Sequence, residues 1–352
     1  MYAQLRRKYD FTDVMLWLIG AGLVISIVYG SYVTLASGKY TLQQWLNFVV
    51  FGLAQGGIYA LIALGYTMVY GLLGMINFAH GEIFMLGTFG AFFMSEVLVE
   101  NGLLQNNPFL AILIMVAAAM LVSATTAILM ERIAYRPLRR APRLVPLITA
   151  IGVSYFLQYT ARGLFGSGVE AFPTVPALSG SVSLGLVAIQ RSQIAVFVST
   201  AVLLLILYLF VSRTKIGRGI RAVAEDKDAA ALMGVDVDRT VAISFAIGGI
   251  MAGAAGVLYG LVFRQVSFFM GFVPGLKAFT AAVLGGIGNF TGAVLGGLIL
   301  GVIESLGPSL FLDGLGIPAP HQLKDGIAFT VLVLILIFRP TGILGERLSK
   351  RA

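Results

Sequence analysis

The sequence predicts an all-α polytopic integral membrane protein with about 8–10 transmembrane segments, some of them broken or re-entrant. Its 352 residues are 58% hydrophobic and only 11% charged, with a mean hydropathy of +0.93. Soluble domains carry about 25% charged residues, so a soluble fold of this composition could not cover its surface with charge. The composition therefore excludes a cytosolic globular enzyme, a disordered chain and a solenoid with a polar face.

Uncharged runs give the expected spans in order along the chain. A hydrocarbon core of about 30 Å needs roughly 20 apolar helical residues, and several runs approach or exceed that length. These runs cover residues 14–35, 40–81, 83–99 (interrupted by Glu96), 108–130, 144–161, 192–212, 241–263, 278–303 and 326–338. The first run follows Arg6, Arg7 and Lys8 but is longer than a signal-peptide core. Residues 1–40 are therefore expected to form a cytoplasmic tail and an extra transmembrane anchor.

The distribution of lysine and arginine predicts the orientation. The N-terminus and residues 132–143, 213–239 and 339–352 together hold 18 of the 24 basic residues, which leaves six for the alternate loops. Because cytoplasmic loops are enriched in basic residues, we expect that side, with both termini, to be cytoplasmic. An even number of crossings must then separate residues 213–239 from the tail. Residues 278–311 are accordingly expected to cross twice or to form a re-entrant hairpin.

The glycine-rich stretch 285–289 is the expected break in that hairpin. Irregular backbone is tolerated at membrane depth only where protein or a water-filled cavity covers it, so this stretch is a candidate lining element. A similar Gly-x-x-Asn-Phe pattern occurs at residues 74–78 and 286–290, which suggests a structural repeat. Small-xxx-small pairs at 249/253, 256/260, 292/296 and 297/301 favour close helix packing inside the chain or contact with a second membrane subunit.

Few ionisable groups fall inside the apolar runs, and such groups usually face a cavity or a partner. His80 and Glu82 adjoin in one of them. They could line a solute pathway or act as a proton relay, or Glu82 could cap a helix at the cytoplasmic edge. Glu304 could contact a substrate or lie at the interface. With no cysteine and two distant histidines, the chain offers no thiol chemistry and no histidine-based metal site, and we expect no cofactor.

The loop at residues 213–239 combines mixed charges with good helix formers. The stretch 222–233 predicts a short helix that stops at Gly234. Such a helix between two spans buries little by itself, so it either docks into a partner or is a solvated loop. The chain has no phosphate-cradling G-x-x-x-x-G-K-[ST] motif. Any active transport must therefore draw its energy from an ion gradient or from another chain.

Five blocks, in order, are similar to one family. They are residues 56–82 (GGIYALIALGYTMVYGLLGMINFAHGE), 131–139 (ERIAYRPLR), 221–226 (RAVAED), 277–288 (KAFTAAVLGGIG) and 340–345 (PTGILG). They resemble the LivH-type permease subunit of branched-chain amino-acid ABC importers. The resemblance implies a permease domain at residues 41–346, with an outside loop at 164–191, a coupling loop at 213–239 and a cytoplasmic tail at 347–352.

The resemblance also implies a coupling helix that docks on an ATPase. Permeases of ABC importers carry an E-A-A-x3-G pattern there, and Asp228-Ala229-Ala230-x3-Gly234 has this spacing with aspartate in place of glutamate. The ATPase-coupling residues it implies are Arg221, Glu225, Asp226, Asp228, Ala229, Ala230 and Gly234. The implied partners are ATP-binding-cassette ATPase subunits, a second homologous permease, a periplasmic substrate-binding protein and the lipid bilayer, with no nucleic acid.

The expected function is transport of leucine, isoleucine or valine through a pathway in a bacterial inner membrane, with ATP hydrolysis by other subunits. Urea or short amides are an alternative cargo, and an ion-coupled secondary carrier is an alternative class. An intramembrane enzyme built on His80 and Glu82 would lack a nucleophile or a metal set. A pathway for a small zwitterion needs small residues and a few polar groups. The candidates are Asn77, His80, Glu82, Thr280, Gly285, Gly286, Gly288, Asn289 and Glu304.

Overall fold

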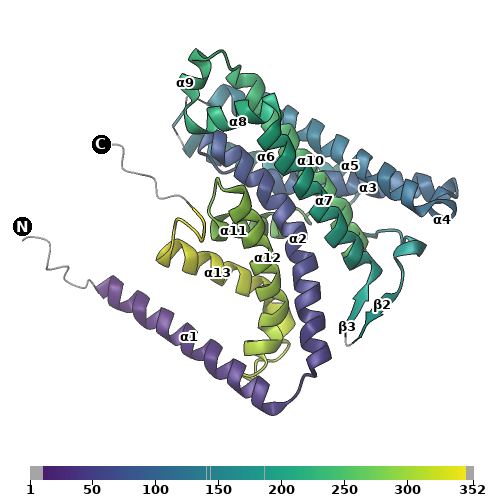
Figure 1. The fold of residues 1–352 in the computed structure, drawn as a ribbon, viewed down its shortest axis with the longest axis vertical. Coiled ribbons are helices and arrows are strands. Elements are labelled where there is room, and N and C mark those ends of the chain that lie inside the picture. Colours follow the sequence, from purple (N-terminus) through teal and green to yellow (C-terminus); the bar gives the residue numbers. More distant parts are fainter. Residues whose placement is uncertain (1–10, 140, 143, 186, 346–352) are drawn as a thin grey trace, which may run out of the picture.

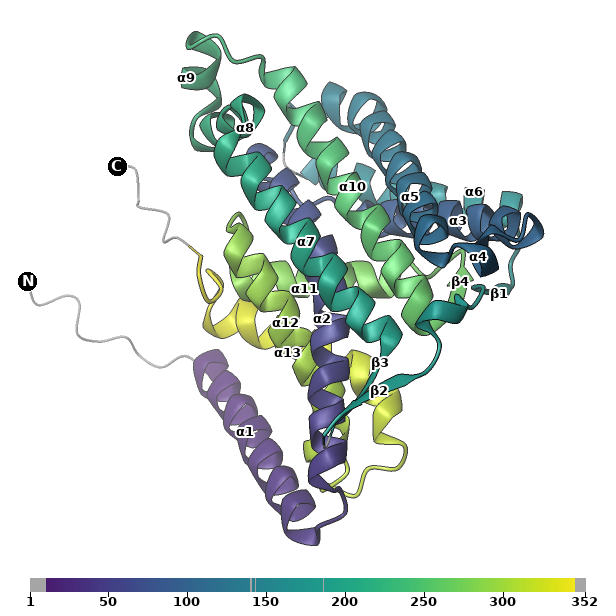
Figure 2. The ribbon, with the colours of Figure 1, turned by 45° about the vertical axis from the view of Figure 1, so that its right-hand side comes forward.

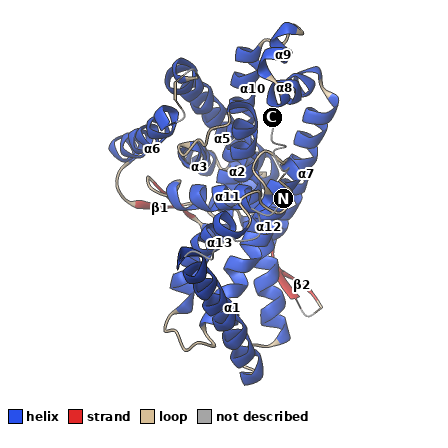
Figure 3. Cartoon of the chain, turned by 90° about the vertical axis from the view of Figure 1, so that its left-hand side faces the viewer, coloured by secondary structure: helices blue, strands red, loops and turns tan. Residues whose placement is uncertain are grey.

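The computed structural model describes residues 11–139, 141–142, 144–185 and 187–345. The expected cytoplasmic stretch before residue 11 and the expected tail 347–352 lie outside these residues. The described part is almost entirely helical (Figure 3). Within it, nine helices are long and apolar enough to cross a membrane, and one shorter apolar helix accompanies them. The predicted fold class, an all-α protein with about ten membrane segments, is confirmed.

The described part of the chain consists of long helices joined by short helices and short strands. The long helices are α1 (Phe11–Ser37), α2 (Leu42–Leu73), α3 (His80–Glu100), α5 (Pro108–Met130), α6 (Leu144–Phe165), α7 (Arg191–Arg213), α10 (Val237–Phe263), α12 (Phe290–Gly307) and α13 (Lys324–Phe338). The short helices are α4 (Leu103–Asn106), α8 (Lys215–Glu225), α9 (Lys227–Leu232) and α11 (Phe272–Gly285). The strands are β1 (Val169–Ala171), β2 (Ser181–Leu184), β3 (Val187–Gln190) and β4 (Gln265–Ser267). Single π-helical turns continue α5 (Glu131–Tyr135) and α12 (Pro308–Leu312).

Helices α2 and α10 form the buried centre of the bundle. Helix α2 packs on α12, α10 and α11, and α10 packs on α5 and α3 (Figures 1 and 2). Glycines allow the backbones to approach: Gly301 of α12 lies against Gly52 and Gly56 of α2. Each small-xxx-small pair singled out in the sequence has glycines that touch neighbouring helices or loops of this same chain. These pairs therefore serve packing inside the subunit.

Contacts between loops assign the two ends of the bundle. Strand β1 pairs with β4, which joins the loop after α6 to the loop after α10. Lys39, after α1, forms an ion pair with Asp313, after α12, at 2.7 Å. Helices α8 and α9 lie at the opposite end, where α7 and α10 meet (Figure 1). Of the basic loops predicted to share one side, residues 213–239 are thus separated from these two contacts by the length of the bundle (Figure 1).

The chain breaks at the predicted glycine-rich stretch. Helix α11 ends at Gly285 and α12 begins at Phe290. With 14 residues, α11 is only about 21 Å long and cannot cross a 30 Å core. Gly286 has a φ of 108°, a left-handed backbone that favours glycine. Residues 272–312 therefore form a helical hairpin of one short and one long arm.

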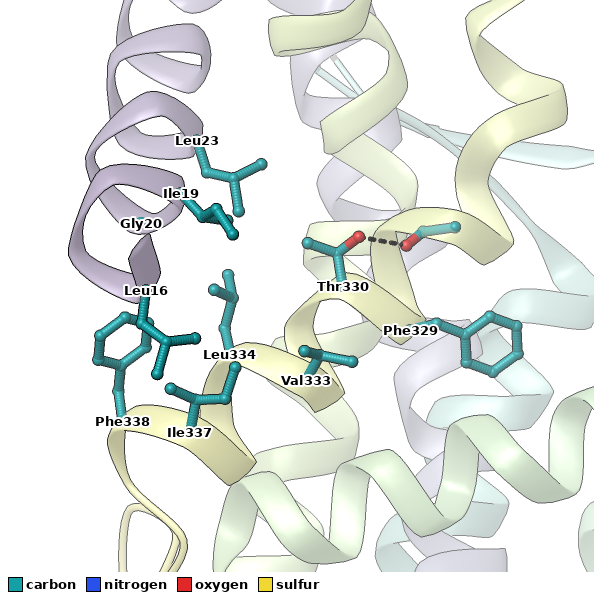
Figure 4. Close-up of a pocket in the computed structure, with 11 residues that line it drawn as sticks. Leu16, Ile19, Gly20, Leu23, Phe329, Thr330, Val333, Leu334, Ile337 and Phe338 are labelled. Atoms are coloured by element: carbon teal, nitrogen blue, oxygen red, sulfur yellow. Dashed lines mark hydrogen bonds between the residues drawn. The ribbon is translucent and has the colours of Figure 1, made fainter. Parts of the chain in front are cut away.

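Helix α1 lies at the edge of the bundle. Gly30 contacts Phe311, and Trp17 packs edge-on against Phe338 of α13 at 6.1 Å between ring centroids. An apolar groove separates α1 from α13 (Figure 4). The hydroxyl of Thr330, which lines the groove, donates a hydrogen bond to the carbonyl oxygen of Gly326. The other described residues that line the groove are apolar side chains and glycines, so the groove lacks the polar groups that a solute site needs.

Candidate functional site

The candidate coupling loop consists of two short helices rather than the single helix predicted over residues 222–233. The carboxylate of Asp226 accepts the backbone N–H groups of Asp228 at 2.9 Å and Ala229 at 3.0 Å. This side chain caps a new helix, α9, and the backbone of Asp226, with a φ of −154°, ends α8. Helix formers fill both pieces, so propensity alone could not reveal the capping aspartate between them.

Helix α9 presents an apolar tip. Ala230 is buried at 4% exposure, whereas the side chains of Leu232 and Met233 are 88% and 84% exposed. Gly234 follows with a φ of 84° and ends the helix, as expected of a C-terminal glycine. The other residues singled out for coupling, Arg221, Glu225, Asp226, Asp228 and Ala229, are exposed. Leu232 and Met233 were not singled out from the sequence, although their apolar character beside the charged stretch was the available signal.

An ion-pair network holds the base of this loop. Glu131 is fully buried and accepts hydrogen bonds from Arg136 at 3.2 Å and from Arg139. Arg139 also pairs with Asp238 in the first turn of α10. Burial lowers the pKa of Lys227 in α9, and the nearby Arg139 lowers it further. The end of α5 and the start of α10 are thereby tied together beside α9.

Glu82 does not cap a helix at the edge of the bundle, which corrects that interpretation. It is fully buried, and its Oε1 accepts hydrogen bonds from Ser154 Oγ at 3.1 Å and Gln158 Nε2 at 2.7 Å. Both donors lie on the single buried stripe of α6. Hydrogen bonds of this kind hold helices together in lipid. Glu82 therefore fastens α6 to α3.

Asn77 and His80 lie close to Glu82 in the same buried region. The His80 ring packs against Tyr66 at 4.9 Å between centroids, and Asn77 Oδ1 accepts from Tyr135 at 2.8 Å and from its own loop at Ala79 N. Among the described residues, Asn77 Nδ2, His80 Nε2 and Glu82 Oε2 have no hydrogen-bond partner.

Glu304 is not interfacial, as one expectation had it, but lies in a buried ion network. It pairs with Lys277 of α11, and Tyr59 donates to its Oε2 at 2.9 Å. Lys277 also reaches Asp325 of α13 at 2.6 Å. Lys277 is one of the six basic residues that the sequence leaves to the alternate loops, because the uncharged run begins only at residue 278. The structure instead places it within α11, at 3% exposure.

The break between α11 and α12 is closed by the chain itself. Asn289 Oδ1 caps α12 by accepting from Gly292 N at 3.0 Å, and Asn289 Nδ2 donates to Leu344 O at 3.0 Å. Gly286 lies against Gly345, and the buried Thr280 donates to Leu276 O within its own helix at 2.9 Å. Asn77 plays a comparable part before α3, after a left-handed Gly74 with a φ of 64°. In both Gly-x-x-Asn-Phe segments the asparagine organises a turn that leads into a helix.

Comparison with known proteins settles the family. Residues 48–336 match the family described as "Branched-chain amino acid transport system / permease component". The chain belongs to this family. It is 45% identical over 308 residues to the high-affinity branched-chain amino acid transport system permease protein BraD of Pseudomonas aeruginosa, which covers 87% of this chain and 96% of that protein. It is 41% identical over 312 residues to LivH of Escherichia coli, with the same coverage.

A more distant relative is the probable LivH permease of Methanocaldococcus jannaschii, 27% identical over 81% of this chain and 88% of that protein. Among solved structures, a metal-chelate-type ABC transporter chain in an inward-facing conformation covers 90% of this chain, with a TM-score of 0.39 and 17% identity, too distant to support an argument. The resemblance drawn from the sequence blocks is confirmed. The permease is a multi-pass membrane protein of a class that works with an ATPase and other ABC subunits.

The matched family range begins after α1. Helix α1 therefore lies outside the matched range, and its being an extra anchor stays a prediction. Of the pathway candidates, Asn77, His80, Glu82, Thr280 and Glu304 are buried inside this single subunit. Glu82 is linked to α6 through Ser154 and Gln158, whereas Glu304 is linked to α11 and α2 through Lys277 and Tyr59.

Proposed function

We propose that this chain is the permease subunit of an ATP-driven importer for the branched-chain amino acids leucine, isoleucine and valine. The cargo is supported by the relatives BraD and LivH, which are branched-chain amino acid permeases and align with this chain over 96% of their length. The proposed partners are two ATPase subunits, a second homologous permease and a periplasmic binding protein. The proposed location is a bacterial inner membrane with both termini in the cytoplasm, where ATP hydrolysis by the partner ATPases drives the cycle.

The observation that carries the coupling role is the apolar tip of α9. Two large apolar side chains, Leu232 and Met233, stand almost fully exposed at the end of a capped helix. Exposed apolar side chains beyond the membrane ends mark protein contacts rather than lipid contacts. The helices on either side, α7 and α10, run through the bundle from this end. A push on α9 would therefore be transmitted to α10, which packs on α2, α3 and α5.

The test of coupling is the double variant L232A/M233A. Apolar anchors at the centre of an interface dominate its free energy, so co-purification of the ATPase should fall by about tenfold or more and uptake should fall with it. The matched control is V169A/V182A, which removes two exposed valines from strands β1 and β2 at the other end. Wild-type co-purification and uptake in L232A/M233A would refute docking through α9.

The test of cargo and energy source is uptake by cells that lack their own importers and express the permease with its partner subunits. Labelled leucine, urea and acetamide are compared. Leucine uptake that needs the ATPase and survives collapse of the ion gradient supports the proposal. Uptake of urea or acetamide instead would reassign the cargo. Leucine uptake that persists without the ATPase and stops with the gradient would identify a secondary carrier.

A further inference from the structure

The buried ion network around Lys277 joins three helices of the permease. Lys277 of α11 pairs with Glu304 of α12 and with Asp325 of α13. The side chains of Lys277 and Glu304 are 4% and 1% exposed, whereas that of Asp325 is 43% exposed. Ionisable residues within membrane segments are costly and are retained for a role. Neutralising Lys277 would need one carboxylate, and here two surround it.

The two carboxylates are held very differently. Glu304 also accepts a hydrogen bond from Tyr59, which itself accepts one from Gln55 at 2.5 Å. Taking Lys277 away from Glu304 would leave a buried, uncompensated charge, which is strongly unfavourable. Asp325 lies in the first turn of α13 with 43% of its side chain exposed, so its carboxylate can be solvated when it leaves Lys277. Asp325 is therefore the replaceable partner of Lys277, and Glu304 is the permanent one.

The position of this cluster suits a solute site. Lys277 lies on α11, the short arm of the broken hairpin, and discontinuous helices of this kind form substrate sites in many transporters. Asp325, the half-exposed member of the cluster, stands at the start of α13 directly after the loop that holds Asp313, on the side of the bundle that carries the Lys39–Asp313 pair. In the proposed orientation this is the outer side, from which cargo would arrive.

We propose that Lys277 and Asp325 form a subsite for the charged head group of an amino acid. The substrate carboxylate takes the position on Lys277 that Asp325 occupies, and the released Asp325 carboxylate accepts the substrate ammonium group. Glu304 keeps Lys277 charged and fixed throughout the exchange. The inference rests on the proposed function, because it assumes that the cargo is a zwitterionic amino acid. A neutral amide such as urea would gain nothing from this exchange.

The test measures ligand-induced thermal stabilisation of the purified permease–ATPase complex without a binding protein. The probes are leucine, leucinamide, which lacks the carboxylate, and 4-methylpentanoate, which lacks the ammonium group. Binding to the folded state raises Tm in proportion to affinity. We expect leucine to raise the Tm of the wild type and of K277R, and the two analogues to bind at least about tenfold more weakly.

Two variants separate recognition from a purely structural network. K277Q/E304Q removes both buried charges together, leaves no unpaired buried ion because the remaining Asp325 is 43% exposed, and should lose the response to leucine. D325N changes an exposed side chain, so it should fold, and it should reduce the preference for leucine over 4-methylpentanoate by about tenfold. The control K39Q, which breaks the other ion pair at this end, should keep the wild-type preference.

A static network predicts a different result. An unchanged preference in D325N, a full leucine response in K277Q/E304Q, or no response of the wild type to leucine would each overturn the subsite. Tm without ligand and elution as a single species verify that each variant is folded. Leucine uptake is measured in parallel: uptake by the wild type with a negative binding result removes the subsite alone, whereas absence of leucine uptake removes the proposed function itself.

Discussion

Leu344 donates its backbone N–H to the carbonyl oxygen of Gly285 at 2.9 Å, and Ile343 donates to Leu284 at 2.8 Å. These carbonyls belong to the last turn of α11, where a helix has no partners of its own for them. Because α11 ends inside the bundle, unpaired carbonyls there would be costly in a lipid environment. The segment after α13 therefore completes the broken helix, and we expect a change in this segment to act on the hairpin.

Gly342 provides the most direct test of this closure. It has a φ of 74°, and a Cβ there would lie 2.5 Å from Gly286 N and from Val283 O. G342A should therefore lower the free energy of unfolding by more than the roughly 1–2 kcal/mol of left-handed strain alone. Gly316 has a φ of 72° and open space around it, so G316A reports the strain by itself. Equal Tm losses in the two variants would contradict a tight closure.

The sequence predicted the membrane segments and the break because both depend on local composition. The length of an apolar run identifies a membrane span, and a cluster of glycines identifies a turn, without any knowledge of which other helices pack against them. The role of Asn289 could not be predicted, because its partner Leu344 is 55 residues away. The same holds for Lys277, whose burial depends on α12 and α13. Spacing along one segment carries no information about which distant helix supplies a counter-charge.

The contact between α2 and α12 depends on glycine. A Cβ on Gly56 would lie 2.7 Å from Gly297 O and 2.8 Å from the Cα of Leu298. G56V should separate the two helices and lower stability by about 1–3 kcal/mol through overpacking. Gly152 in the middle of α6 has no neighbour within 4 Å, so G152V applies the same change of residue without the clash. Thermal unfolding in detergent measures both, and a G56V protein as stable as G152V would refute the close approach.

The ion pair between Lys39 and Asp313 makes the docking of α1 dependent on pH. The hydrogen bond from Lys39 holds the pKa of Asp313 below its ordinary 3.8, and the same bond raises the pKa of Lys39 above 10.5. The stability that the charged Asp313 adds is therefore fully present above pH 3.8, and it is lost as the pH falls through the lower pKa of Asp313 in the folded protein. The stability that the charged Lys39 adds is fully present below pH 10.5, and it is lost as the pH rises through the raised pKa of Lys39 in the folded protein.

The measurement is the difference in Tm between the wild type and K39Q. Between pH 5 and 9 the difference should be constant, because both groups stay charged over that window. Toward pH 3 it should shrink as Asp313 becomes protonated. Both side chains are near the surface, so the effect is small and should weaken with added salt. A difference that persists unchanged at pH 3 would exclude the ion pair as its source.

Arg139 ties the coupling loop to the bundle through two carboxylates. R139Q leaves the buried Glu131 paired with Arg136 and removes the link to Asp238. We expect R139Q to lower leucine uptake per ATP hydrolysed, because the base of α9 no longer moves with α5. R139K should do so less, since lysine keeps one of the two pairs. R132Q, a change of an exposed arginine seven residues earlier, is the control, and equal coupling in R139Q and R132Q would remove this role.

Glu82 can act by holding α6 to α3 or as a charged group in the transport pathway, and two variants separate these roles. E82A leaves Ser154 and Gln158 without their acceptor inside the bundle, which should destabilise the permease by about 1–3 kcal/mol. E82Q keeps an amide oxygen for both donors, so its Tm should stay close to that of the wild type. If holding α6 to α3 is the whole role of Glu82, E82Q also keeps the wild-type rate of uptake. Loss of uptake in a stable E82Q protein would show instead that the carboxylate charge itself takes part in transport, and that its unpaired Oε2 is the atom involved.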